Sequence, residues 1–429
     1  MTMASQATPI WSKPFYRGWF LFLLTMAYAL NFLDRQLLSI LQEPVKAELE
    51  LSDTQLGLIG GPVFALLYVG LGVPIARLSD RTNRVRIISG AIGLWSIATA
   101  TCGLAANFFQ LAASRMTVAV GEAAATAPSY ALLADLYKKE QRASAIGIFT
   151  TGTSIGSALG LALGGWVGFT YGWRSAFLII GLPGVLLALV IFLTLREPPR
   201  GFSDGRSADV PPAKFAEVAK RALATRAFPG IAFAIGIASI SGFALAHWMP
   251  SFMVRSFGVT IAEAGWRVAL ASGGGGLVGG LVGGFVCDRL AKRDRRWWCW
   301  APAIAFFLNI PLMLLLFRAT SATEAMLLMA AVLFLYHFWG GAGHSLIQSL
   351  VGVRMRATAA ALFLMCISLI GQGLGPLVVG FASDRLHAGA GAESLRYALM
   401  ATTPVWLVAG LLWMWAATRL REELDNTPE

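Results

Sequence analysis

Four charged residues lie inside stretches of sequence that are otherwise apolar. Asp34 and Arg35 interrupt the first long apolar run, and Arg115 and Glu122 interrupt the run from 108 to 136. A charge inside a hydrocarbon-length helix costs about 3 kcal/mol or more, so it persists where it faces water or protein rather than lipid. These four side chains therefore predict a polar transport pathway through a membrane.

The chemistry of the four side chains suggests two roles. Arg35 or Arg115 is expected to bind an anionic group, because a guanidinium stays charged when buried and pairs with phosphate or carboxylate through two parallel hydrogen bonds. Asp34 and Glu122 are candidate proton carriers, with Glu122 favoured because it lies nearer the midplane. A carboxylate that loses its arginine partner to a substrate gains a proton more readily. The alternative is that the charges only neutralise one another and hold two helices together.

Helical geometry brings the four residues to compatible depths. Asp34 lies about 22 Å above the inner end of its helix, and Arg115 lies about 10 Å below the outer end of the other helix. In a hydrocarbon core of about 30 Å the two are near one level. Arg115 and Glu122 are seven residues apart, so they share a helix face at a separation of about 10 Å. Both side chains can point into one cavity.

The composition indicates a polytopic membrane protein. Of 429 residues, 56% are hydrophobic and only 13% are charged, and the mean hydropathy is +0.65. The sequence predicts an all-α membrane protein with twelve transmembrane helices in two six-helix halves. Their approximate ranges are 18–41, 54–78, 87–105, 108–136, 142–168, 174–195, 228–254, 264–287, 297–317, 324–350, 358–382 and 396–417.

A polar linker and internal repeats divide the chain. We predict an N-terminal half over 1–195, a cytoplasmic linker over 196–226 that is rich in proline, glycine and charge, and a C-terminal half over 227–429. The repeats are Ser79-Asp80-Arg81, Cys287-Asp288-Arg289 and Ser383-Asp384-Arg385. The first two copies end equivalent helices 208 residues apart, and the third ends a helix of opposite direction, as three-plus-three inverted repeats require.

The basic residues predict the orientation. With the N-terminus inside, the inner segments hold 25 of the 34 lysines and arginines, the outer loops hold seven, and two lie within helices. The positive-inside rule then places both termini in the cytoplasm, and the short loops suggest a bacterial inner membrane. Because the basic residues are spread over many loops, no nucleic-acid partner is expected. The four cysteines lack metal-ligand spacing, so free thiols and no metal site or cofactor are expected.

The first two repeat copies are candidate gating elements at the inner helix ends. A carboxylate there can accept hydrogen bonds from a neighbouring helix N-terminus, and the arginines can pair across the halves when the inner side is closed. Plain anchoring to the inner membrane surface is the alternative. The candidate gating residues are Asp80, Arg81, Arg84, Asp288 and Arg289.

The C-terminal half offers polar and aromatic residues for a cavity wall instead of charges. The candidate substrate-binding residues here are His247, Trp248, Tyr336, His337 and Gln372. For each of them, simple packing between helices is an equally good interpretation. Charge on one side of the cavity and an aromatic, apolar wall on the other would suit an amphiphilic substrate.

Several motifs resemble those of the major facilitator superfamily. The segment ARLSDRTNRVR (76–86) is similar to the superfamily's inner-loop signature, with Ala76 and Asn83 in place of glycines. The glycines from Gly147 to Gly165 are similar to its fifth-helix signature, although Leu161 stands where proline is common, which leaves the direction of coupling open. Closer resemblance to the Spinster-like branch rests on NFLDR (31–35), on Arg115 with GEA (121–123), and on REPPRG (196–201).

This resemblance implies a secondary transporter that works by alternating access. Spinster-like proteins move lysolipids or phosphorylated sphingoid lipids, with proton coupling, which implies an anionic amphiphile as substrate here. The same charged motifs are also similar to those of proton symporters for aromatic acids and sugar acids, so these small organic anions are the alternative. Neither resemblance nor motif suggests an enzyme. The expected partners are the substrate, protons and membrane lipids, and a monomer is expected.

Overall fold

The computed structural model of the chain describes residues 10–79, 81–203, 215–351 and 355–425. After the short η1 (Ile10–Ser12), the first half contains α1 (Pro14–Leu49), α2 (Asp53–Gly60), α3 (Pro62–Ser79), α4 (Arg84–Cys102), α5 (Phe108–Leu136), α6 (Lys139–Tyr171), α7 (Trp173–Gly181) and α8 (Pro183–Thr194). Helix α9 (Phe215–Ala224) lies in the predicted linker. The part of this linker from 204 to 214 lies outside the described residues.

The second half repeats this plan with more interruptions. It contains α10 (Ala227–Phe257), α11 (Ile261–Ala291), α12 (Trp297–Leu316), α13 (Ala322–Tyr336), η2 (His337–Trp339), α14 (Gly340–Ser349), α15 (Arg356–Cys366), the π-helical η4 (Ile367–Gln372), α16 (Gly373–Ala390), η5 (Gly391–Glu393), α17 (Ser394–Met400), α18 (Pro404–Ala417) and α19 (Leu420–Asp425). With consecutive short helices joined, each half makes six passes in the part of the chain that the structure describes, as predicted.

Proline residues explain where three of the passes divide. Pro62, Pro183 and Pro404 each stand at the first position of a new helix, directly after the breaks between α2 and α3, α7 and α8, and α17 and α18. Proline has no N–H to donate and disfavours helical backbone at the residue before it, but it is well tolerated in the first turn of a helix. The passes therefore continue across each break with a local interruption of the hydrogen-bond ladder.

Helices long and apolar enough to cross a membrane account for most of the bundle. In the described part of the chain nine helical segments meet these criteria, and one of them, Thr358–Ala417, contains two of the predicted passes. Helices α1 and α5 are not among the nine, because the polar and charged residues discussed above lower their hydropathy. The two helices with the weakest membrane signal are thus the two that carry the intramembrane charges.

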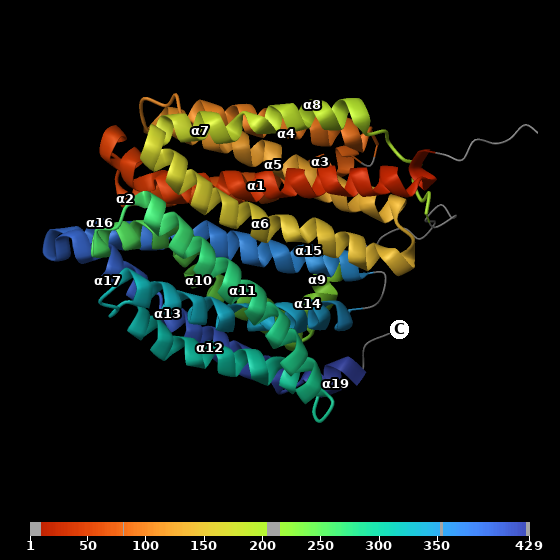
Figure 1. Cartoon of the computed structure of the whole chain (residues 1–429). Helices are drawn as coiled ribbons and strands as arrows, with labels where there is room; N and C mark the ends of the chain where they lie inside the picture. Colours follow the sequence, from red (N-terminus) through yellow and green to blue (C-terminus); the bar gives the residue numbers. More distant parts are fainter. Residues whose placement is uncertain (1–9, 80, 204–214, 352–354, 426–429) are drawn as a thin grey trace, which may run out of the picture.

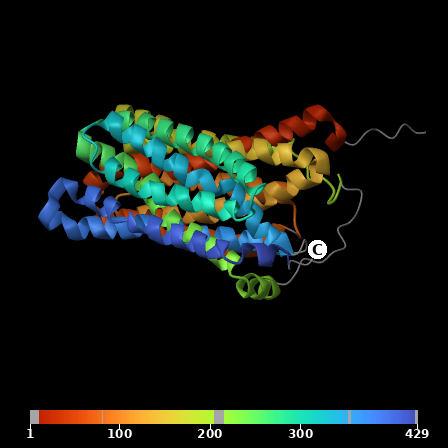
Figure 2. The same ribbon diagram turned by 90° about the horizontal axis from the view of Figure 1, so that it is seen from below.

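The two halves form two layers that meet along the length of the bundle (Figure 1). Helices α1 and α6 of the first half face α10 and α11 of the second, and α2 packs on α16. Helix α9 lies below the bundle at the end where α19 lies, as Figure 2 shows. We call this end the Arg84 end and the opposite one, where α2 begins, the Asp53 end.

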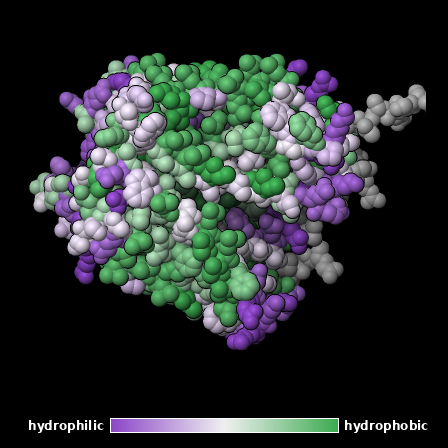
Figure 3. All heavy atoms as spheres, in the orientation of Figure 1, coloured by the Kyte–Doolittle hydropathy of each residue, from purple (hydrophilic) through white to green (hydrophobic). Residues whose placement is uncertain are grey.

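Side-chain polarity varies along the axis that joins the Arg84 end to the Asp53 end. In Figure 3 apolar residues cover the middle of the molecule and polar residues gather towards its ends. The exposed apolar side chains include Leu186 and Leu193 on α8 and Leu281 and Phe285 on α11. A broad exposed apolar band of this kind would be unstable in water but is expected of a surface in contact with lipid.

Glycines allow helix α6 to pack directly on two neighbours. A Cβ atom at Gly156 would collide with the backbone carbonyl of Ala29 on α1, within the same half. A Cβ atom at Gly265 of α11 would collide with the Leu161 carbonyl on α6, in the opposite half. Small residues permit such backbone contact in membranes. These glycines thus serve packing both within a half and between the halves.

Candidate functional site

Helices α1 and α5 bring the four intramembrane charges together. The Arg35 guanidinium pairs with the Glu122 carboxylate, with 2.6 Å between Nε and Oε2. Arg115 donates a long hydrogen bond of 3.4 Å to the backbone carbonyl of Asp34. The Asp34 carboxylate accepts a hydrogen bond of 3.3 Å from Thr99 on α4. The carboxylate of α5 therefore pairs with the arginine of α1, across the two helices rather than along one of them.

Arg35 is held on its other sides by aromatic rings. Its guanidinium carbon lies 4.9 Å from the ring centre of Phe32, 4.7 Å from that of Phe64 and 4.8 Å from that of Tyr68. The face of an aromatic ring attracts a cation, and more strongly where water is excluded. Arg35 is thus fixed in place by one carboxylate and three rings.

Arg115 has much weaker protein partners. It is 3% exposed, and among the described residues no carboxylate lies within 4 Å of its guanidinium. Its Nε atom is buried and has no hydrogen-bond partner, and the same holds for one carboxylate oxygen of Asp34 and one of Glu122. Buried charges are normally paired and fully hydrogen-bonded. An anion supplied from outside the chain would complete the hydrogen bonding of Arg115.

Two adjacent cavities lie between the halves beside these charges. The smaller one, which we call the anion chamber, has a volume of about 100 Å³ and is lined by Arg35 and Arg115. The larger one, the apolar chamber, has a volume of about 550 Å³ and lies between α6 and α11, where the face in Figure 3 is hollowed. The two chambers share the wall residues Phe32, Gln36, Phe243 and Ala246.

The candidate residues of the second half divide between these chambers. His247 and Gln372 line the anion chamber, and Tyr336 and His337 line the apolar chamber. Trp248 lines neither chamber. It is fully buried, and its indole donates a hydrogen bond of 3.0 Å to the Pro376 carbonyl on α16.

The candidate gating residues at the Arg84 end make contacts within their own halves and with the linker. Arg84 pairs with Asp135 of the first half and with Glu197 at the start of the linker, at 2.6 Å each. Asp288 accepts a hydrogen bond of 3.3 Å from the Trp298 indole of the second half. Arg81 and Arg289 are exposed, and Asp80 lies outside the described residues. In the described part of the chain these residues do not join the two halves.

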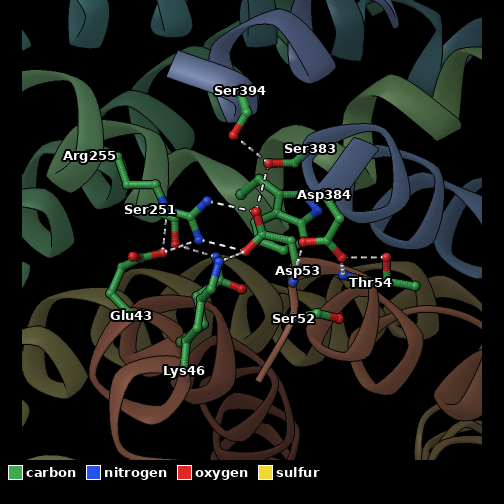
Figure 4. Close-up of polar contacts among 12 residues, drawn as sticks. Glu43, Lys46, Ser52, Asp53, Thr54, Ser251, Arg255, Ser383, Asp384 and Ser394 are labelled. Atoms are coloured by element: carbon green, nitrogen blue, oxygen red, sulfur yellow. Dashed lines mark hydrogen bonds and ion pairs between the residues drawn. The ribbon is translucent and has the colours of Figure 1, made fainter. Parts of the chain in front are cut away.

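At the Asp53 end, by contrast, a dense polar network joins the halves (Figure 4). Its centre is Asp53, the first residue of α2, which is 2% exposed. Arg255 of α10 binds both of its carboxylate oxygens at 2.7 Å, and Lys46 of α1 binds one at 2.5 Å. Ser383 of α16 donates a hydrogen bond of 2.6 Å to the same carboxylate. Arg255 also pairs with Glu43 at 2.8 Å.

The third repeat copy completes this network. The Asp384 carboxylate accepts hydrogen bonds from the backbone N–H groups of Asp53 and Thr54, at 3.0 and 2.7 Å, and from the Thr54 hydroxyl. These are free N–H groups at the N-terminus of α2, where a carboxylate is favoured. We call the residues Glu43, Lys46, Asp53, Thr54, Arg255, Ser383 and Asp384 the Asp53 latch.

The Asp53 latch was not among the candidate sites predicted from sequence. Lys46 and Arg255 are two of the seven basic residues of the predicted outer loops, and Ser383-Asp384-Arg385 is the third repeat copy. The sequence signal for the latch was the repeated Asp-Arg motif, of which Asp384 belongs to the third copy. The hydrogen bonding expected of the first copy, a carboxylate at a neighbouring helix N-terminus, is the one that the third copy makes at the opposite end.

Comparisons with known proteins show the family of the chain. The family model described as Major Facilitator Superfamily matches residues 24–376. An "MFS-type efflux pump" of Mycolicibacterium smegmatis is 32% identical over 94% of this chain and 92% of its own length. A "Probable L-galactonate transporter" of Escherichia coli (strain K12) is 26% identical over 85% of this chain and 83% of its own.

A solved structure shares the whole architecture. It is that of a bacterial homolog of the human lysosomal transporter Spinster, in an inward-facing and unoccupied conformation. Its TM-score is 0.89 at 31% identity, over 96% of this chain and 99% of that one. The twelve-pass fold, the charged pair of helices and these similarities together establish that the chain belongs to the Major Facilitator Superfamily of membrane transporters and is related to its Spinster-like members.

Proposed function

We propose that the protein is a proton-coupled secondary transporter that carries an organic anion by alternating access. Arg115 binds the anionic group of the substrate in the anion chamber, Glu122 carries the proton, and Arg35 links the two events. The anion chamber opens and closes to either side of a bacterial inner membrane, with both termini in the cytoplasm and the Asp53 end outside. The protein acts as a monomer.

The observation that carries this proposal is the difference between the two arginines. Arg35 has an ionic partner in Glu122, whereas Arg115, which is only 3% exposed, has none among the described residues. A buried guanidinium that lacks a carboxylate partner and lines a cavity is suited to bind a phosphate or carboxylate from a ligand. The charge of Arg115 is therefore better suited to recognition of an anionic ligand than to helix packing.

Proton coupling follows from the Arg35–Glu122 pair. A substrate anion at Arg115 lies in the same chamber as Arg35 and attracts its guanidinium away from Glu122. A buried carboxylate that loses its cationic partner takes up a proton, because its charged form is no longer stabilised. Substrate and proton then move together. Asp34, hydrogen-bonded to Thr99, is the second proton candidate.

We expect Glu122→Gln to abolish transport driven by a pH gradient while substrate binding persists, because glutamine cannot ionise. Uptake into proteoliposomes under an imposed pH gradient, with counterflow exchange measured in parallel, tests this. The matched control is Glu324→Gln, which removes an exposed carboxylate at the start of α13. Uptake by the Glu122 variant that still follows the pH gradient would remove Glu122 from the proton role.

The two chambers together favour an anionic amphiphile. The apolar chamber is the larger, and its wall includes Leu161, Leu277 and Leu333. A lysolipid or a sphingoid phosphate would place its headgroup at Arg115 and its chain in this chamber. The second candidate is a sugar acid, favoured by the similarity to the L-galactonate transporter, and such a substrate would occupy the anion chamber alone.

A thermal-shift screen followed by uptake tests the proposal. Purified protein is heated with lysophospholipids, sphingoid phosphates, aromatic acids and sugar acids, since a ligand that binds the folded state raises the melting temperature by mass action. Any stabilising anion is then tested for uptake and counterflow in proteoliposomes. Stabilisation by single-chain lipids selects the amphiphile, stabilisation by sugar acids selects the alternative, and the absence of anion-dependent stabilisation across all four classes contradicts the proposal.

The repeat copies at the Arg84 end act as the gate on that side. When this end closes, Asp80 and Asp288 with their arginines hold the halves together, in the way that Asp384 holds α2 at the opposite end. Arg84 holds the first half and the start of the linker together through Asp135 and Glu197.

A further inference from the structure

Helix α10 contains a proline that leaves one carbonyl without a backbone donor. Pro250 has no N–H, so the carbonyl of Ala246, four residues earlier, cannot make its normal helical hydrogen bond. The donor comes from the opposite half of the molecule. The Ser39 hydroxyl on α1 lies 3.0 Å from the Ala246 carbonyl oxygen and 2.8 Å from that of His247, and shares its proton between them.

Gln42 makes a second connection one turn further along α1. Its side-chain amide donates to the His247 carbonyl at 2.9 Å and to the Ser251 hydroxyl at 2.7 Å. Ser39, Gln42 and Ser251 are at most 2% exposed. Helix α1 thus holds α10 on both sides of Pro250 through buried hydrogen bonds. We call Ser39 and Gln42 the α1–α10 clasp.

The clasp lies between the anion chamber and the Asp53 latch. Ser39 and His247 line the anion chamber. Four residues beyond Gln42 on α1 stands Lys46, and four residues beyond Ser251 on α10 stands Arg255, both of which bind Asp53. Residues four apart lie on one face of a helix, so clasp and latch follow one another along the same α1–α10 contact.

We propose that Ser39 and Gln42 are positioning residues of the transport cycle that connect the anion chamber to the Asp53 latch. They hold α10 against α1 at Pro250 while the Asp53 end is closed. When their bonds break, the 251–257 segment is free to hinge at the proline and draws Arg255 away from Asp53. Because proline already interrupts the hydrogen-bond ladder at this point, the segment can bend there at little cost. This inference rests on the alternating access of the proposed function.

Hydrogen–deuterium exchange of the ligand-free protein in nanodiscs tests the clasp. Ser39→Ala should speed exchange of the amides of 251–257 and 53–60 by about tenfold, as expected for the loss of a buried hydrogen bond. Amides in the first turns of α4, which begins at the Arg84 end, should keep their wild-type exchange rates. Ser39→Thr retains the hydroxyl and should restore the original exchange.

The matched control is Ser129→Ala. Ser129 is equally buried, but its hydroxyl donates to the Ala125 carbonyl within α5. Wild-type exchange at the Asp53 end in Ser39→Ala, or an equal increase in Ser129→Ala, would overturn the proposal. If Ser39→Ala fails to fold, Gln42→Leu removes the other donor of the clasp and should speed exchange of the same amides. Because no ligand is added, a failure of the anion proposal in the binding screen leaves this result intact.

Discussion

Replacing Arg115 with glutamine is expected to lower anion uptake about 100-fold or more. Glutamine keeps a hydrogen-bond donor in the anion chamber but loses the charge and the two-pronged geometry of the guanidinium, and a charge-assisted interaction in a buried site is worth several kcal/mol. The loss should appear in substrate binding as well as in transport. Thermal shifts with the anion identified in the screen measure binding, and proteoliposome uptake measures transport.

Two further variants show whether the effect belongs to recognition. Arg115→Lys keeps the positive charge but loses the two-pronged geometry of the guanidinium. It should therefore take up a carboxylate or phosphate better than Arg115→Gln but less well than the wild type. Arg267→Gln removes an arginine from the Asp53 end of α11, where it lies over the Trp266 ring and donates to Thr323, and should leave uptake near the wild-type value. If Arg115→Gln bound and carried the anion as the wild type does, Arg115 would be a packing residue.

Asp53→Asn is expected to shift the protein strongly towards the state in which the Asp53 end is open. The substitution leaves Arg255 and Lys46 facing a neutral amide, and removing one partner of a buried ion pair costs about 3–5 kcal/mol. Most of this cost falls on the closed state, because opening exposes both cations to water. A change of this size moves a two-state equilibrium by at least 100-fold.

Spin labels at Ala47 of α1 and Ala388 of α16, in a chain whose four cysteines are replaced, report this opening as a longer distance. Both positions are exposed and lie outside the latch. Ser383→Ala removes a single neutral donor from Asp53 and should produce a smaller shift in the same direction. Asp425→Asn, at an exposed ion pair with Arg295, should produce none. An unaltered distance in Asp53→Asn would show that the latch does not control this end.

The fold was predictable in outline because membrane helices satisfy a strong physical constraint locally. Every backbone group in hydrocarbon must bond within its own helix, so length and hydropathy predict most of the passes. The repeat spacing of Asp80 and Asp288 further predicted two similar halves. The prolines that divide passes were visible, but where each division would fall was not predicted, because proline at a helix start and proline inside a helix, as at Pro250, look alike in sequence.

Which helices carry charge in the membrane is evident from the sequence, but how those charges pair depends on the tertiary structure. Seven-residue spacing placed Arg115 and Glu122 on one face of α5, but only the approach of α1 joined Glu122 to Arg35 and left Arg115 facing the anion chamber. Apart from the repeat copy that contains Ser383 and Asp384, the Asp53 latch could not be predicted from sequence for the same reason. Its members come from α1, α2, α10 and α16, and their charges lie near helix ends, where burial by an opposite half leaves no local pattern.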